Sequence, residues 1–181
     1  LVGAQRAAHG RDYCAHHQII ADSSFFGTRY AELGVNQGAT IACALLGGAY
    51  AKKKRMLVFA PDEAVAASLD RLLWTQPALG FVPHGRADSA VADETPILIT
   101  GNLDSPPQDE RLMNLGRDVP PGFARFHSLI EVVGQDEDER LAGRDRVKFY
   151  RDRGYEIRYF DLANRYGKPA CPVTSSPVPT P

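Results

Sequence analysis

The sequence contains few of the features that mark secreted, membrane-spanning or strongly nucleic-acid-binding proteins. Its most apolar uncharged stretch, Ala39 to Ala51, is shorter than the ~20 apolar residues that a membrane-spanning helix needs. The 21 basic and 22 acidic residues give a net charge of −1, so whole-molecule charge does not predict tight sequence-independent binding to nucleic acid. We therefore expect no membrane association, no tight direct binding to nucleic acid, and only local attraction to any acidic partner.

Cysteine is also scarce. Cys14, Cys43 and Cys171 are odd in number and far apart, which does not build a disulfide framework and favours the reducing environment of the cytoplasm. Arg6 and Arg11 interrupt the first residues, which therefore lack the continuous apolar core of a secretory signal. The sequence thus predicts a cytoplasmic protein.

No complete catalytic or cofactor-binding motif is visible. Gly34 to Gly38 has the glycines of a phosphate loop, but no Gly-Lys-Ser/Thr follows. Cys14 to His17 contains metal-ligand residue types, but no second Cys or His pair follows at zinc-finger spacing. His84 has no evident general-acid partner and is expected to fix a turn by hydrogen bonding. The carboxylates at 136–139 are better explained by the start of a helix than by a magnesium site. We expect no active site, metal or cofactor; the alternative is a small α/β nucleotide-dependent enzyme with a degenerate phosphate loop.

The chain length favours one domain with less regular ends. Residues 1–27 show no sustained periodicity and are expected to form a poorly ordered or atypical extension. Residues 165–181 are rich in proline and are expected to be disordered. Residues 28–164 would then form a single α/β domain.

Apolar runs and helical periodicity alternate through this domain. Helices are expected at 39–52, from Pro61 to before Pro77, and at 136–153, where Gly154 is a typical left-handed stop. Strands are expected at the following segments: 28–35, 56–60, 96–99, 112–115, 129–133 and 155–160. This alternation predicts a three-layer sandwich with a mostly parallel, Rossmann-like sheet and helices on both faces.

The helix expected at 136–153 separates its charges, with acids in the first turn and cations after them. At about 100° per residue, four cations fall within an arc of roughly 80° that Leu141 and Val147 flank: Arg140, Arg144, Lys148 and Arg151. Such a face can bind an acidic peptide that ends in a hydrophobic residue, because arginine grips carboxylates bidentately. It can equally be a solvated face with weak ion pairs, each worth less than ~1 kcal/mol.

The only tryptophan lies at a second candidate surface. Trp74 and Phe81 flank a helix-to-loop transition that contains Pro77 and Pro83. Large aromatic side chains held by a proline-bounded loop are well suited to gripping another protein. The alternative is that both rings seal the edge of the domain's own core.

Three segments carry a family resemblance. Leu-Leu-Trp at 72–74, Phe-Val-Pro-His at 81–84 and Phe-Tyr-Arg-Asp-Arg-Gly-Tyr at 149–155 resemble the chi subunit of bacterial DNA polymerase III in sequence, order and spacing. The resemblance runs from about Thr28 to about Leu162. It implies a non-catalytic clamp-loader accessory subunit that links the replicase to single-stranded DNA-binding protein during DNA replication, with only indirect contact with DNA.

The resemblance also implies two binding sites. The acidic, phenylalanine-terminated tail of single-stranded DNA-binding protein would bind the late helix at Arg144 and Lys148 with Arg140 nearby, and Val147 and Val133 would add apolar contact. The aromatic surface would receive the psi subunit of the clamp loader or a helicase. Its residues here would be Trp74, Phe81 and Pro83.

Overall fold

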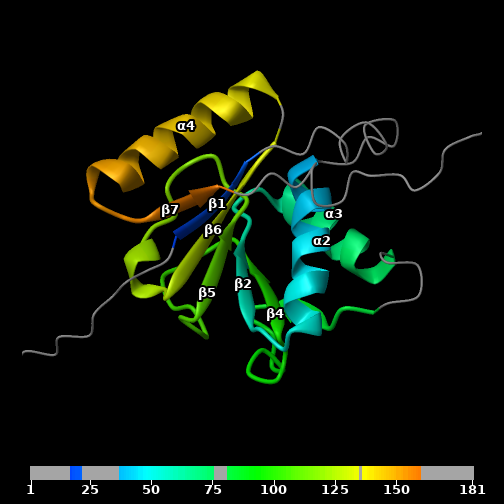
Figure 1. Ribbon diagram of the computed structural model, residues 1–181. Coiled ribbons are helices and arrows are strands. Elements are labelled where there is room, and N and C mark those ends of the chain that lie inside the picture. Colours follow the sequence, from blue (N-terminus) through cyan, green and yellow to red (C-terminus); the bar gives the residue numbers. More distant parts are fainter. Residues whose placement is uncertain (1–16, 22–36, 76–80, 135, 160–181) are drawn as a thin grey trace, which may run out of the picture.

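A computed structural model of the protein describes residues 17–21, 37–75, 81–134 and 136–159. Within these residues the strands form one seven-stranded sheet (Figure 1). The strands are β1 (His17–Ala21), β2 (Met56–Phe59), β3 (His84–Arg86), β4 (Ile97–Thr100), β5 (Arg111–Asn114), β6 (Ser128–Val133) and β7 (Ile157–Tyr159). Their order across the sheet is β3-β4-β2-β5-β6-β1-β7, and every pairing among them is parallel.

Helices cover both faces of this sheet. Helices α2 (Gln37–Ala51) and α3 (Glu63–Thr75) pack together on one face, and α4 (Glu137–Asp152) lies on the other (Figure 1). A short 3-10 helix, η2 (Phe123–Arg125), adds Phe123 to the core on the α4 side. The three-layer sandwich predicted from the sequence is therefore confirmed. None of the described helices is both long enough and apolar enough to cross a membrane.

Strand β2 shows why continuous apolar runs mark the central strands. All four of its residues are buried, because alternate side chains enter two separate cores. Met56 and Val58 pack in the core that contains α2 and α3, whereas Leu57 and Phe59 pack in the core that contains Tyr150 of α4.

The ends of α3 and α4 follow local sequence rules. Asp62 precedes α3, and its carboxylate accepts a hydrogen bond from the Ala64 backbone N–H at 2.8 Å. Gly154 ends α4 with a φ of 80°, and the Tyr155 N–H donates to the Tyr150 carbonyl at 3.1 Å. The predicted glycine stop is thus confirmed, and it fixes where the last strand can begin.

The structure differs from the sequence expectation at two strands. Strand β1 lies within the expected extension, and its residues from Gln18 to Ala21 pair in register with Ile130 to Val133 of β6. Strand β3 is short and lacks apolar alternation, so no local sequence pattern predicted it. The strand expected at 28–35 and the tail at 165–181 lie outside the described residues.

Candidate protein-docking surfaces

Helix α4 presents its predicted cations to solvent. Arg140, Arg144 and Lys148, which we call the basic stripe, are all exposed. Leu141 beside them is also exposed, at 49%, and Val147 is half-buried. The opposite side of the helix, at Gly143, Arg146 and Tyr150, is buried against the sheet. The structure therefore brings the stripe and an apolar margin together on one outer face.

One carboxylate already contacts part of the basic stripe. Glu137 Oε2 lies 3.3 Å from Arg140 Nη1, and Glu137 Oε1 lies 3.8 Å from Arg144 Nη1. These three side chains are 48 to 65% exposed, so solvent screens both contacts. No ion pair of Lys148 is seen within the described part of the chain.

Val133 lies beneath the helix and not on this outer face. It is only 7% exposed, and a Cβ built at Gly143 would approach both of its methyl carbons to 2.9 Å. Val133 therefore supports α4 as a core residue. The sequence-based assignment of Val133 to the peptide-binding surface does not agree with this burial, because the close approach of α4 to β6 covers the side chain.

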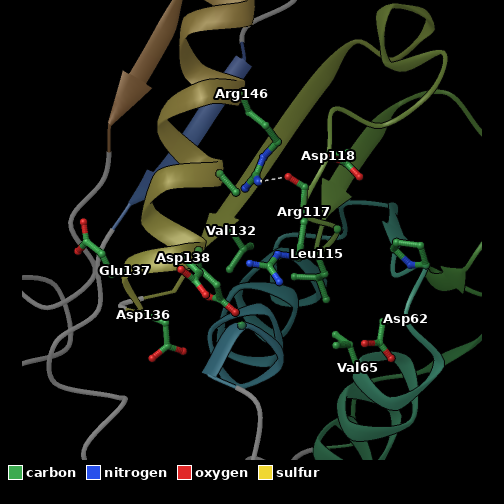
Figure 2. A pocket seen from close by; sticks show the side chains of 15 residues that line it. Asp62, Val65, Leu115, Arg117, Asp118, Val132, Asp136, Glu137, Asp138 and Arg146 are labelled. Atoms are coloured by element: carbon green, nitrogen blue, oxygen red, sulfur yellow. Dashed lines mark hydrogen bonds between the residues drawn. The ribbon is translucent and has the colours of Figure 1, made fainter.

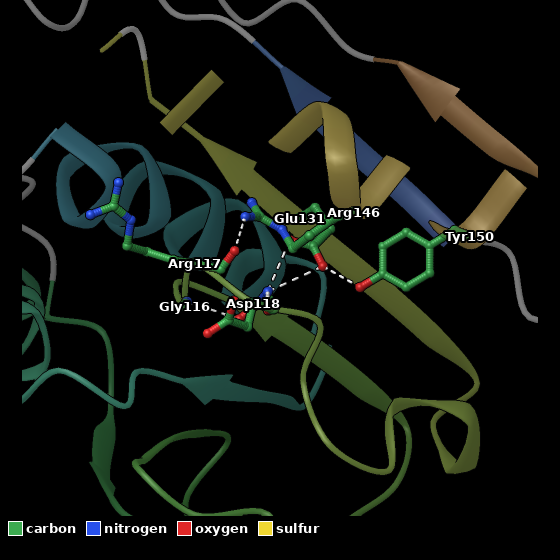
Figure 3. A network of polar contacts seen from close by, with 7 residues as sticks. Gly116, Arg117, Asp118, Glu131, Arg146 and Tyr150 are labelled. Carbon is green, nitrogen blue, oxygen red and sulfur yellow. Dashed lines mark hydrogen bonds and ion pairs between the residues drawn. The ribbon is translucent and has the colours of Figure 1, made fainter. Parts of the chain in front are cut away.

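A buried polar network holds the inner side of α4 (Figure 3). Arg146 Nε lies 2.8 Å from Glu131 Oε2 on β6, and Arg146 Nη1 donates to the Arg117 carbonyl at 2.6 Å. The Tyr150 hydroxyl donates to Glu131 Oε1 at 2.5 Å, and the Asn114 side-chain amide donates to both Glu131 oxygens. Arg146 is only 5% exposed and belongs to this anchor, so it is unavailable to a ligand of the basic stripe.

Burial shifts the pKa values of two residues of this network, Glu131 and Tyr150. Burial raises the pKa of Glu131, while the nearby charge of Arg146 and the hydrogen bonds from Tyr150, Asn114 and Arg146 oppose that rise. Burial, and secondarily the Glu131 carboxylate, also raises the pKa of Tyr150, which keeps its hydroxyl a donor. The sequence interpretation missed Glu131. The available signal was a single acid within the apolar strand Leu-Ile-Glu-Val-Val.

A cavity of about 860 Å³ lies where the carboxyl ends of the strands meet the starts of the helices (Figure 2). Its acidic lining residues are Asp62, Asp118, Asp136, Glu137, Asp138 and Glu139. Arg117 and Arg146 also line it, but the Arg146 guanidinium is already paired with Glu131. This excess of carboxylates is unfavourable for phosphate groups at the cavity. Most of the glycine segment 34–38, on which the nucleotide-dependent alternative rests, lies outside the described residues.

The aromatic pair on the α3 side is exposed. Trp74 is 61% exposed and Phe81 is 53% exposed, with ring centroids 5.0 Å apart. Leu72 and Leu73 on α3 and Val82 are buried instead. The two rings therefore do not seal the core. Their exposure favours the prediction of a docking surface over that of a core edge. We call the exposed group Trp74, Phe81 and half-buried Pro83 the aromatic surface.

The buried side chain of His84 packs against the aromatic surface. Its side chain is 1% exposed, and its ring lies edge-on to Trp74 with centroids 5.3 Å apart. Nδ1 lies 2.7 Å from the Val82 carbonyl oxygen and must carry a proton to donate to it. Nε2 lies 3.2 Å from Asp70 Oδ1, a contact that becomes an ion pair when the ring is protonated. His84 thus fixes the chain at the start of β3, in line with the expected turn-fixing role.

Comparison with known proteins decides the family. Residues 26–158 match the family described as DNA polymerase III chi subunit, HolC. The chain belongs to the chi subunit family of DNA polymerase III. It is 31% identical over 120 residues to the chi subunit of Pseudomonas aeruginosa, a match that covers 65% of this chain and 82% of that protein. It is 26% identical over 125 residues to the chi subunit of Escherichia coli, which covers 68% and 85% of the two chains.

A third relative gives the same result. The chi subunit of Haemophilus influenzae is 30% identical over 119 residues, covering 65% of this chain and 82% of that protein. The resemblance inferred from the motifs at 72–74, 81–84 and 149–155 is therefore confirmed, and its range agrees with the family match. Membership of the chi family gives this chain an accessory role in DNA replication.

Proposed function

We propose that this chi-family protein is a non-catalytic subunit of the DNA polymerase III holoenzyme that links the clamp loader to single-stranded DNA-binding protein. The basic stripe would bind the acidic C-terminal tail of single-stranded DNA-binding protein. The aromatic surface would bind the psi subunit or a helicase. The observation that carries the proposal is the exposure of Arg140, Arg144 and Lys148 together on one face of α4.

The chemistry of the basic stripe suits such a tail. Arginine forms paired hydrogen bonds to carboxylates, and the exposed side chain of Leu141 offers an apolar contact beside them. Half-buried Val147 flanks the stripe on its other side. Each contact with an exposed charge is weak, so affinity would come from several contacts and from the high local concentration of tails on coated DNA.

The fixed orientation of α4 on the sheet supports this role. Glu131 holds Arg146 and Tyr150 on the inner side of the helix, which fixes the rotation of α4 on the sheet. A fixed rotation keeps the basic stripe directed away from β6, so binding need not pay to orient the helix. The tail would therefore meet a preformed surface.

The test is the substitution Arg144→Ala. We expect roughly ten-fold weaker binding of the acidic tail peptide in calorimetry, because a charged contact to a carboxylate is lost. Arg71→Ala is a matched control, since it removes an exposed arginine from α3 on the opposite face of the sheet. Equal dissociation constants for the wild type and Arg144→Ala would contradict the assignment of the tail site.

A further inference from the structure

The exposed cations of α4 are not equally available. Glu137 divides its two carboxylate oxygens between two guanidinium groups, with Oε2 at 3.3 Å from Arg140 and Oε1 at 3.8 Å from Arg144. This arrangement resembles the way in which one external carboxylate would bridge the two arginines. Part of the basic stripe is therefore occupied by a group of the same chemistry as its proposed ligand.

Helix geometry places Glu137 among these cations. Arg140 lies three residues after Glu137 and Arg144 lies seven residues after it, so all three share one face. As the first residue of α4, Glu137 is also stabilised by the positive end of the helix dipole. Its position at the end of the stripe is thus set by the helix itself.

The other acids near the start of α4 make no ion pair with the basic stripe among the described residues. The Glu139 carboxylate folds against Gly134, where a built Cβ would collide with it. Asp138 lines the cavity, as Glu137 and Glu139 also do, so only the ion pairs distinguish these acids. Among the described residues, no ion pair joins Asp138, Glu139 or Asp145 to the basic stripe. Glu137 is thus the acid that the geometry links to the stripe.

We propose that Glu137 is an intramolecular competitor that limits the affinity of the basic stripe for an acidic peptide; this inference rests on the proposed tail site. A peptide carboxylate that binds Arg140 and Arg144 must displace Glu137 from both. The displacement is easy because all three side chains are largely exposed, so Glu137 lowers affinity without closing the site. Lys148 lies outside this competition and remains available for the first electrostatic contact.

The substitution Glu137→Gln tests the proposal. It keeps the size and shape of the side chain but removes the charge that holds the two guanidinium groups. We expect about three- to ten-fold tighter binding of the acidic tail peptide by calorimetry at physiological salt, because two screened ion pairs no longer compete. A gain in affinity cannot result from misfolding, which would weaken binding.

Asp145→Asn is the matched control. It removes the same charge from an exposed position on the same helix, adjacent to Arg144 in sequence, where no ion pair to the stripe is seen within the described residues. We expect its affinity to change by less than about two-fold, as for a charge effect screened by solvent. In the double variant Glu137→Gln/Arg144→Ala, the gain from Glu137→Gln should shrink, because one of the two released arginines is gone.

The outcomes separate this inference from the proposed function. Unchanged or weaker binding by Glu137→Gln, in a protein whose wild type binds the peptide, overturns the inference alone. An equal gain from Asp145→Asn also overturns it, because the effect would then reflect overall charge and not the specific contact. Absence of binding by the wild type contradicts the tail site itself, and the inference with it.

Discussion

Glu131 illustrates how one buried residue can determine the placement of a candidate binding face. It lies on β6, on the α4 side of the sheet, and receives hydrogen bonds from Tyr150, Asn114 and Arg146. Removing one member of a buried charge pair usually costs about 3–5 kcal/mol, since the remaining charge is left without its partner. Although remote from any proposed ligand, Glu131 therefore positions the helix that carries the basic stripe.

The pH dependence of folding should report the ionisation of Glu131. Burial raises its pKa above the ordinary value of 4.5, so the folded protein retains a proton at pH values where the unfolded chain has lost it. The corresponding stability is fully present below pH 4.5 and is lost as the pH rises through the folded-state pKa. The stability of the wild type relative to Glu131→Gln should therefore decrease with rising pH.

Urea unfolding of both proteins at several pH values from 4 upward measures this difference, in which the other titrating groups largely cancel. A stability difference that increases with pH would contradict the prediction. It would show that attraction to Arg146 outweighs burial and holds the pKa of Glu131 below its ordinary value.

At the scale of elements, α4 approaches β6 closely because Gly143 has no side chain. A Cβ there would lie 2.9 Å from both methyl carbons of Val133, closer than real contacts allow. This glycine is inside a helix, where glycine is otherwise about 1 kcal/mol less favourable than alanine. The packing of the helix on the strand thus outweighs the local helix propensity.

Gly143→Ala should therefore destabilise the protein, opposite to the usual effect of this substitution in a helix. Overpacking typically costs about 1–3 kcal/mol, which exceeds the gain in helix propensity. Gly47→Ala in α2 is a matched control that should stabilise, because no atom of the described residues lies within 4 Å of its built Cβ. Chemical denaturation measures both variants. A smaller destabilisation by Gly143→Ala in a Val133→Ala background than in the wild type would confirm the cause, and a stabilised Gly143→Ala would contradict it.

The elements most predictable from sequence are those with a local signal. The apolar run of β2 and the glycine stop after α4 gave correct positions from residue types alone. Strand β3 has the sequence His-Gly-Arg and exists through its pairing with β4, a non-local interaction. The basic stripe followed from helical periodicity, whereas the burial of Val133 depends on how closely α4 packs on β6, which no local pattern encodes.

At the scale of the whole molecule, the two candidate docking surfaces lie on opposite sides of the sheet. The basic stripe is on α4, and Trp74 belongs to α3 in the opposite layer (Figure 1). The sheet between them separates their electrostatic and steric environments. If both proposed sites are used, two partners would therefore bind without competing for the same residues.

This arrangement predicts that the two surfaces fail independently. Trp74→Ala should abolish co-purification of the psi subunit or helicase and leave the affinity for the acidic tail peptide unchanged, because the lost ring lies in the other layer. Arg144→Ala should show the reverse pattern. Loss of both activities in Trp74→Ala would instead indicate unfolding, which circular dichroism would detect.

The aromatic surface also carries its own optical reporter. The chain contains a single tryptophan, and more than half of that side chain is exposed beside Phe81. Because Trp74 is the only tryptophan, the indole fluorescence of the unlabelled protein arises at this one surface. Indole emission shifts when solvent is excluded from the ring. Quenching by acrylamide would therefore reveal whether an added protein covers that location, even when the identity of the protein is not known beforehand.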